Sequence, residues 1–215
     1  MSARAALFDF DLTLMDTSYA ITECTNAFAG KMGLRRVTRE EALTVIGLPI
    51  AESWIKLWGR FEEEWLDIYR QDFRDREHEG FREFSDTRGA LSRLRENGVK
   101  VGVVSNRKFA MKAVTVCGIA SLFDVVIGLE DVQHPKPHPE SVITALSRLS
   151  AEPGLSFYTG DTDIDMKTAV AAGVTGIGVT TGNFGEGELE AAGAAHACPN
   201  LSAVADIILN ISGNN

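Results

Sequence analysis

The stretch AALFDFDLTLMDT, residues 5–17, places two acidic side chains directly behind a short apolar run. The run has the length and composition of a buried strand, and Asp9 and Asp11 come at its end. In open parallel sheets, ligands bind beyond the carboxyl ends of the strands. The acidic pair is therefore either part of a solvated turn or the start of a site that holds a cation.

Strand-like and helix-like segments alternate from about residue 85 onward. The strand-like runs are KVGVVS, DVVIG, LSFYTG and TGIGVT, at residues 100–105, 124–128, 155–160 and 175–180. Such alternation predicts a parallel sheet that is covered by helices on both faces. With right-handed crossovers, the expected fold class is α/β, a three-layer Rossmann-like core.

Residues 17–80 have a different texture, with no strand-like run. Thr38 and Glu41 are spaced as a helix capping box. The stretch 51–73, AESWIKLWGRFEEEWLDIYRQDF, reads as one long helical segment that holds all three tryptophans, and we expect its aromatic rings to pack helices together. We therefore predict an all-helical insert at residues 16–84 and a core formed by residues 1–15 and 85–215.

The overall composition narrows the class of protein. The chain has 215 residues, of which 45% are hydrophobic, and a formal net charge of −9. This charge argues against nucleic acid or an anionic membrane as the main partner, but it does not exclude a small anionic substrate. The three cysteines lie far apart and indicate no disulfide framework, and no segment is long enough to span a membrane. We expect a cytoplasmic protein.

The carboxyl ends of the later strands carry further polar side chains. Ser105 and Asn106 end one strand, Asp161 and Asp165 follow another, and Lys136 lies in the loop HPKPHPE. Each feature alone is typical of a turn or a helix cap. Together they would crowd several carboxylates at one sheet edge, which is electrostatically costly without a cation. Oxygen ligands of this kind suit Mg²⁺, which often shares a substrate phosphate.

These residue types suit phosphoryl transfer. A carboxylate can attack phosphorus and form an aspartyl-phosphate, and Mg²⁺ lets the anionic substrate approach it. Lys136 can stabilise charge on the phosphoryl oxygens, to which Ser105 and Asn106 can also hydrogen-bond. Asp11 can protonate the leaving oxygen and later accept a proton from water.

DFDLTL, VVSN, the lysine of HPKPHPE and GDTDID occur in this order and resemble the four motifs of the haloacid dehalogenase superfamily. The helical insert resembles the C1 cap domain of that superfamily, so the resemblance covers nearly the whole chain. It implies that Asp9 is the nucleophile and a Mg²⁺ ligand. It implies that Asp11 is the acid/base and binds the metal through its backbone carbonyl, and that Asp161 completes the metal site.

The remaining motif residues take supporting roles by the same resemblance. Ser105 and Asn106 match the phosphate-binding motif, and Lys136 matches the lysine that steadies nucleophile and phosphate. Thr13 and Asp165 would support the site, and Asp165 either supports or shares the metal-binding role.

The superfamily contains several activities. Its dehalogenases lack the second acid of the first motif, so Asp11 favours phosphate chemistry. KPHPE and the segment 180–208 look most like the phosphoglycolate phosphatase group. We predict a Mg²⁺-dependent phosphatase that hydrolyses a small phosphorylated metabolite, with 2-phosphoglycolate as a candidate, as a monomer or homodimer.

Two other functions stay open from the sequence: a sugar phosphomutase on the same scaffold, and an inactive regulatory or scaffold relative. Phosphomutase relatives usually carry a histidine at the start of the cap, whereas no histidine lies between Asp9 and Asp72. His134 and His138 flank Lys136 and indicate either a second metal site or a proline-stiffened loop that aims the lysine. We favour the loop.

The cap surface is expected to set the substrate. Gly47, Leu48 and Pro49 form a predicted tight turn between two helices. This turn either faces the substrate or merely connects the helices.

Overall fold

The computed structural model describes residues 4–213, which divide into two units. The first unit holds the described residues up to Leu14 and those from Glu83 onward, and the second unit is Met15–Arg82. Two short strands, β2 (Met15–Asp16) and β3 (Arg82–Glu83), lie where the chain passes from one unit to the other.

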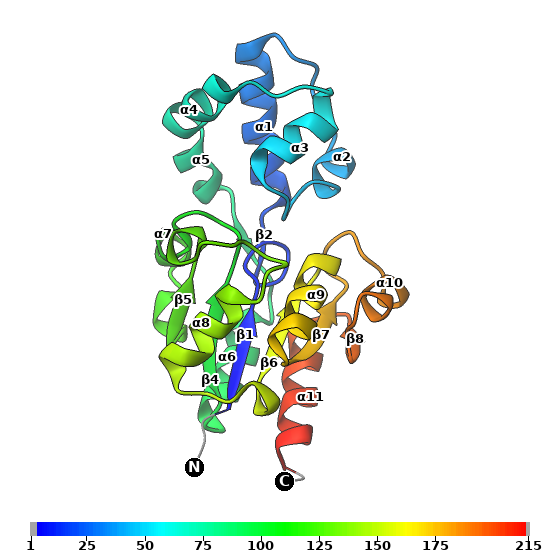
Figure 1. Ribbon diagram of the computed structural model, residues 1–215. Helices are drawn as coiled ribbons and strands as arrows, with labels where there is room; N and C mark the ends of the chain where they lie inside the picture. Colours follow the sequence, from blue (N-terminus) through cyan, green and yellow to red (C-terminus); the bar gives the residue numbers. More distant parts are fainter. Residues whose placement is uncertain (1–3, 214–215) are drawn as a thin grey trace. The chain divides into compact units, whose positions relative to one another are not determined.

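The first unit is built on a six-stranded sheet in the order β5–β4–β1–β6–β7–β8 (Figure 1). All of its ladders are parallel. The strands are, in chain order, β1 (Ala5–Phe8), β4 (Lys100–Val104), β5 (Val125–Ile127), β6 (Phe157–Gly160), β7 (Thr175–Val179) and β8 (His196–Cys198).

The central strand β1 consists of four fully buried residues, as expected for a strand covered on both faces. Leu7 of β1 lies opposite Gly102 of β4 on one side and Tyr158 of β6 on the other. The chain proceeds outward from β1 in both directions, so β1 marks the point at which the strand order reverses. Open α/β sheets bind their ligands at this point, beyond the carboxyl ends of the strands.

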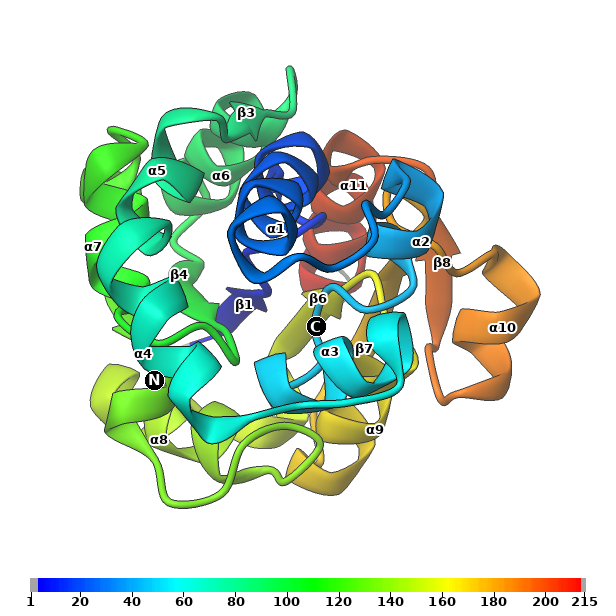
Figure 2. The same ribbon diagram turned by 90° about the horizontal axis from the view of Figure 1, so that it is seen from above.

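Helices cover both faces of this sheet (Figure 2). On one face α8 (Glu140–Leu149) packs against α9 (Asp163–Ala172), and on the other α6 (Thr87–Glu96) packs against α11 (Leu201–Gly213). The shorter helices α7 (Ala110–Val116) and α10 (Glu186–Ala191) contact the outer strands, and three 3₁₀ turns, Ala120–Leu122, Leu129–Asp131 and Pro153–Leu155, complete the unit. The three-layer α/β core predicted from the sequence is confirmed.

The second unit is helical. It contains α1 (Ser18–Met32), α2 (Arg39–Leu43), α3 (Ile50–Trp58), α4 (Glu63–Asp72) and α5 (Arg74–Glu79). The predicted capping box is present, because the Thr38 side chain accepts the Glu41 N–H and the Glu41 carboxylate accepts the Thr38 N–H. The prediction of one long helix over residues 51–73 is wrong, since the chain breaks at Gly59, whose φ of 75° ends α3 in the left-handed region.

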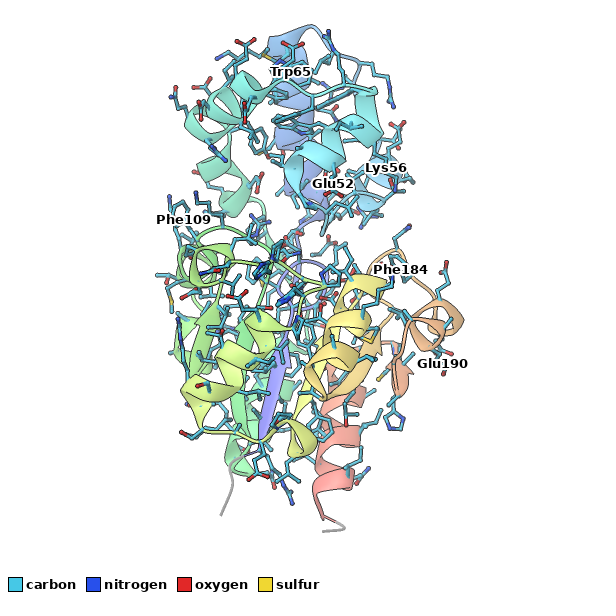
Figure 3. The ribbon with its side chains drawn as sticks, viewed as in Figure 1. Glu52, Lys56, Trp65, Phe109, Phe184 and Glu190 are labelled. Carbon is cyan, nitrogen blue, oxygen red and sulfur yellow. The ribbon has the colours of Figure 1, made fainter. Side chains whose placement is uncertain are left out.

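Aromatic rings form the core of the second unit, as expected. Phe28 of α1 stacks on Trp54 of α3, with ring centroids 4.5 Å apart and planes at 8°. Trp65 and Tyr69 of α4 meet the Phe28 ring edge-on at 5.8 Å. Trp65 is only 2% exposed and lies among the helices (Figure 3). These tryptophans are therefore packing residues of the helical unit.

Two elements near the C-terminus have no counterpart in the sequence-based prediction. They are α10 and the three-residue edge strand β8, which pairs with β7. Among residues 4–213, no helix combines the length and the apolar character that crossing a bilayer would require.

Candidate active site

The turn after β1 presents the acidic pair at the centre of the sheet edge. Asp9 continues the strand pairing, since its backbone N–H donates to Thr159 O at 2.8 Å. Leu12 then adopts a φ of 56°, a left-handed conformation that is uncommon outside glycine. The Thr181 hydroxyl donates to the Leu12 carbonyl and holds this turn from the β7 side. A strained turn that is fixed in this way is typical of functional sites.

Lys136 lies at the centre of the buried polar network. Its Nζ donates to Asp9 Oδ1 at 2.8 Å, to Asp165 Oδ1 at 2.6 Å and to the Tyr158 hydroxyl at 2.7 Å. The lysine side chain is 4% exposed. An ammonium group has three protons to donate, so all of them are used by these partners. Lys136 thus connects the carboxylate after β1 to the carboxylate on α9.

Asp165 is held on both of its oxygens. Besides Lys136, Oδ1 lies 2.9 Å from the Tyr158 hydroxyl, and Oδ2 accepts the Thr162 N–H at 3.2 Å and the Thr162 hydroxyl at 2.6 Å. The Thr162 side chain in turn caps α9 by accepting the Asp165 N–H. A carboxylate has about four acceptor positions, so this set of contacts suits an anchor for Lys136 better than a metal ligand.

Asp161 completes a group of three buried carboxylates. One oxygen each of Asp9, Asp161 and Asp165 lie within 4.8 Å of one another. Asp161 Oδ1 accepts the Thr13 hydroxyl at 3.2 Å, whereas Oδ2 of Asp9 and of Asp161 has no hydrogen bond to any residue between 4 and 213. Gly182 approaches so closely that a Cβ there would lie 1.9 Å from Asp161 Oδ2.

The electrostatics of the three carboxylates call for a cation. Burial, with the charges of Asp165 and Asp11, raises the pKa of Asp9 to about 7 although Lys136 opposes the shift. Burial, with the charges of Asp165 and Asp9, raises the pKa of Asp161 well above its usual range. Burial alone would lower the pKa of Lys136, but the charges of Asp165 and Asp9 outweigh it and raise that pKa. One ammonium does not balance three buried carboxylates, and a divalent cation on the two open oxygens would.

The residues after β4 lie beside this network. Ser105 is 4% exposed and its hydroxyl accepts the Arg107 N–H at 3.1 Å. The Asn106 side chain pairs with the backbone of Lys136, accepting its N–H at 2.8 Å and donating to its carbonyl at 3.1 Å. The Asn106 amide therefore fixes the loop that carries the lysine.

Asp11 faces a residue that the sequence analysis missed. The Arg107 guanidinium donates to both carboxylate oxygens of Asp11, at 3.1 Å from Nε and 2.6 Å from the terminal nitrogen. The two side chains are 12% and 13% exposed. The sequence feature that could have identified Arg107 is its position directly after the Ser-Asn pair. Sequence position alone, however, does not show where so long a side chain points.

Tyr158 is the second missed residue. It lies inside the strand-like run LSFYTG, and its hydroxyl contacts Lys136, Asp165 and, at 2.9 Å, the Val104 carbonyl. The pattern of that run indicated only a buried strand, so a polar role for its tyrosine carried no separate signal.

The predicted site residues thus fall into one connected group. Asp9, Thr13, Lys136, Asp161 and Asp165 share the buried network, and Asp11, Ser105 and Asn106 border it through Arg107 and the Lys136 backbone. The predicted turn at Gly47, Leu48 and Pro49 lies between α2 and α3 of the second unit.

Comparison with known proteins identifies the family. Residues 6–179 match the haloacid dehalogenase-like hydrolase family. The chain belongs to this family. It is 32% identical over 177 residues to pyrophosphatase PpaX of Bacillus velezensis, covering 81% of this chain and 82% of that protein. It is 27% identical to pyrophosphatase PpaX of Bacillus mycoides, covering 99% and 100% of the two chains.

A solved structure supports the same assignment. A haloacid dehalogenase-like hydrolase from Bacteroides fragilis superposes with a TM-score of 0.85 at 30% identity, covering 95% of this chain and all of that one. The resemblance inferred from the four motifs is therefore confirmed. The protein is a hydrolase of the haloacid dehalogenase-like family, of the phosphatase type.

Proposed function

We propose that this haloacid dehalogenase-like hydrolase is a Mg²⁺-dependent phosphatase that forms an aspartyl-phosphate on Asp9. One observation carries the proposal: Lys136 holds Asp9 Oδ1, whereas Asp9 Oδ2 has no hydrogen bond to any described residue, and carboxylate oxygens of Asp9 and Asp161 lie within 4.8 Å of each other. Asp9, Asp161 and the Asp11 backbone carbonyl would hold the metal. When bound, Mg²⁺ would neutralise the carboxylates and the substrate phosphate.

The residues of this chain would then divide the work of the reaction. Asp9 attacks phosphorus with an electron pair of its carboxylate, and the bond from phosphorus to the leaving oxygen breaks. Asp11 would start the cycle protonated on one oxygen that has left Arg107, with the other oxygen still held by it, and would give this proton to that leaving oxygen. Asp11 next takes a proton from water, whose oxygen attacks the phosphorus, and Asp9 is released with inorganic phosphate.

Binding of the transferred group is proposed to use the edge of β4. The Ser105 hydroxyl and backbone N–H groups of the following turn would donate to the phosphoryl oxygens. Asn106 would contribute through its backbone N–H, because its side-chain amide is engaged by Lys136. Lys136 would hold Asp9 in line for attack and stabilise negative charge as the phosphoryl group is transferred.

The helical second unit is proposed to act as the cap domain of this enzyme. A cap excludes water from the reaction and selects substrates by size and charge. The turn at Gly47, Leu48 and Pro49 is the proposed contact to substrate. With a net charge of −9, the enzyme is expected to act on a small cytoplasmic metabolite rather than on nucleic acid or at a membrane.

Two substrates have specific support. The sequence motifs resemble the phosphoglycolate phosphatase group, which supports 2-phosphoglycolate. The relatives from Bacillus velezensis and Bacillus mycoides are named pyrophosphatases, which supports inorganic diphosphate. Both compounds carry a second anionic group close to the phosphorus that is attacked.

The test is phosphate release from a panel that includes 2-phosphoglycolate, diphosphate and p-nitrophenyl phosphate, with Mg²⁺ and with a chelator. We expect turnover that needs Mg²⁺ and is lost in Asp9→Asn, which keeps the shape of the side chain. Conversion of a sugar 1-phosphate to its 6-phosphate would instead support the phosphomutase alternative. A folded protein that releases no phosphate from any compound would support the inactive alternative.

A further inference from the structure

A second cluster of metal-ligating groups lies on the loop that carries Lys136, outside the acidic network. His134, His138 and Glu140 each bring one ligand atom to within 4.8 Å of the others. His134 Nδ1 lies 2.8 Å from Glu140 Oε2, and His138 Nδ1 lies 3.9 Å from the same oxygen. The two imidazole rings are 4.6 Å apart, and their side chains are 61% and 51% exposed.

The ligands are presented by a rigid loop. Prolines at positions 135, 137 and 139 alternate with His134, Lys136 and His138, which restricts the backbone. The Asn106 amide fixes the middle of the loop through the backbone of Lys136. Little conformational freedom remains to be lost when a ligand binds, which favours binding.

Glu140 is also held in place and charged. Its two oxygens accept the backbone N–H groups of Gln133 at 2.9 Å and His134 at 3.0 Å. These hydrogen bonds, with that from the His134 ring, lower the pKa of the Glu140 carboxyl group. A carboxylate fixed in this way can still offer its Oε2 to a cation, because each carboxylate oxygen has two acceptor positions.

We propose that His134, His138 and Glu140 form a binding site for Zn²⁺ or a similar transition metal, distinct from the acidic site at Asp9 and Asp161. Two imidazole nitrogens and one carboxylate oxygen, with a fourth position open to solvent, are a common zinc ligand set. Ligand atoms of a tetrahedral zinc site lie about 3.3 Å apart, given bonds of about 2.0–2.1 Å. The observed separations of 2.8 and 3.9 Å lie on either side of this value, and His138 Nδ1, which accepts the Glu140 N–H at 3.3 Å in the structure, would turn from that N–H to the metal.

The choice of metal follows from the ligands. Imidazole nitrogen suits Zn²⁺, Ni²⁺ and Cu²⁺, whereas Mg²⁺ prefers oxygen ligands and keeps most of its waters. The acidic network offers only oxygen ligands, so we expect Mg²⁺ to bind there and Zn²⁺ to bind at the two histidines and Glu140. The expectation of a merely proline-stiffened loop accounts for the placement of Lys136 and for the hydrogen bonds from the loop backbone to Glu140, but it gives the two converging histidine rings no role.

The proposed site would act on the loop rather than on the substrate. His134 and His138 lie two residues before and after Lys136, so a metal that joins them clamps the backbone on both sides of the lysine. Bound Zn²⁺ is therefore expected to stabilise the folded protein, because the unfolded chain has no preformed site.

The experiment is equilibrium dialysis of the full chain against micromolar Zn²⁺ in a large excess of Mg²⁺, followed by elemental analysis. The variants are the double substitution His134→Ala and His138→Ala, and Asp161→Asn for the acidic site. His196→Ala is the matched control, because His196 is an exposed histidine on β8 and belongs to neither cluster. Circular dichroism checks that each variant is folded.

We expect the double variant to lose one equivalent of Zn²⁺ that wild type, His196→Ala and Asp161→Asn all retain. Zn²⁺ should also raise the melting temperature of wild type and His196→Ala, but not that of the double variant. Equal Zn²⁺ content in wild type and the double variant, or no retained Zn²⁺ in wild type, would overturn the proposal. Metal content and melting temperature do not depend on phosphatase turnover, so failure here is distinct from failure of the proposed activity.

Discussion

Replacing Lys136 by methionine removes the cation that contacts three partners of the buried network at once. In the wild-type protein, Lys136 Nζ donates hydrogen bonds to Asp9, Asp165 and Tyr158, and the lysine side chain is 4% exposed. Methionine keeps a similar length and fills the space, so the loss is confined to charge and hydrogen bonds. The carboxylates of Asp9 and Asp165 then remain buried without their counter-charge.

The size of the effect follows from that geometry. Removing one partner of a buried ion pair costs about 3–5 kcal/mol, because the remaining charge is left uncompensated. For a chain of this length each kcal/mol lowers the melting temperature by about 2–4 °C, so the metal-free variant should melt roughly 6–20 °C below wild type. The deficit should be larger at pH 8 than at pH 5, where the carboxylates can take up protons instead.

The assay is urea and thermal unfolding of wild type and Lys136→Met in chelator at both pH values. Lys167→Met is the matched control, because the Lys167 side chain is 57% exposed and pairs with Asp163 on the surface. Exposed pairs of this kind contribute about 0–1 kcal/mol. If Lys136→Met is as stable as Lys167→Met at pH 8 without metal, the account of a lysine-balanced acidic network is wrong.

Three further changes test other parts of the site. Arg107→Met should lower kcat about tenfold to a hundredfold, because Asp11 loses the two hydrogen bonds that position it. This loss is a part of the rate acceleration of about 10²–10⁴-fold that general acid catalysis supplies. Arg107→Lys should not restore kcat, since lysine cannot form the paired contact, and full activity in both variants would contradict the positioning role. Gly182→Ala should raise the Mg²⁺ concentration for half-maximal activity, because the new Cβ would lie 1.9 Å from Asp161 Oδ2. Gly187→Ala, where a Cβ meets nothing within 4 Å, is its control, and equal Mg²⁺ dependence would count against Asp161 as a ligand. In chelator, the free energy of unfolding should fall as the pH rises from about 4 to about 7. The pKa of Asp9 is raised from 3.8 to about 7 in the folded protein, so the folded state binds more protons than the unfolded chain in this pH range. The urea midpoint at pH 8 should recover when Mg²⁺ is added, and a midpoint that rises from pH 5 to pH 8 without metal would contradict this reasoning.

The features that the sequence predicted correctly are those governed by short-range pattern and sheet topology. Apolar runs such as AALF and KVGVV can only be buried strands in this context, and parallel strands bring their carboxyl ends to one edge. Asp9, Lys136 and Asp161 could therefore be brought together from residues far apart in the chain. The resemblance to a known family rested on the same residues.

Side-chain direction and local backbone breaks were harder to predict. Arg107 is long enough to reach several places, and only the fold shows that it pairs with Asp11. Asn106 could equally have faced a phosphate or the loop of Lys136. The apolar periodicity continues on both sides of Gly59, so it predicted an unbroken helix. The left-handed backbone conformation of Gly59, which ends α3, leaves no mark in that periodicity. Glu140 joined the two histidines only because the loop folds back onto the start of α8.

The most direct test of the central claim is chemical trapping of the intermediate. The enzyme is mixed with Mg²⁺ and ³²P-labelled diphosphate, or 2-phosphoglycolate if that is the better substrate, and quenched in acid within one turnover. The account predicts label on the tryptic peptide 5–31, which contains Asp9, and none in Asp9→Asn. Phosphate release at full rate with no label on that peptide, or label that persists in Asp9→Asn, would contradict it.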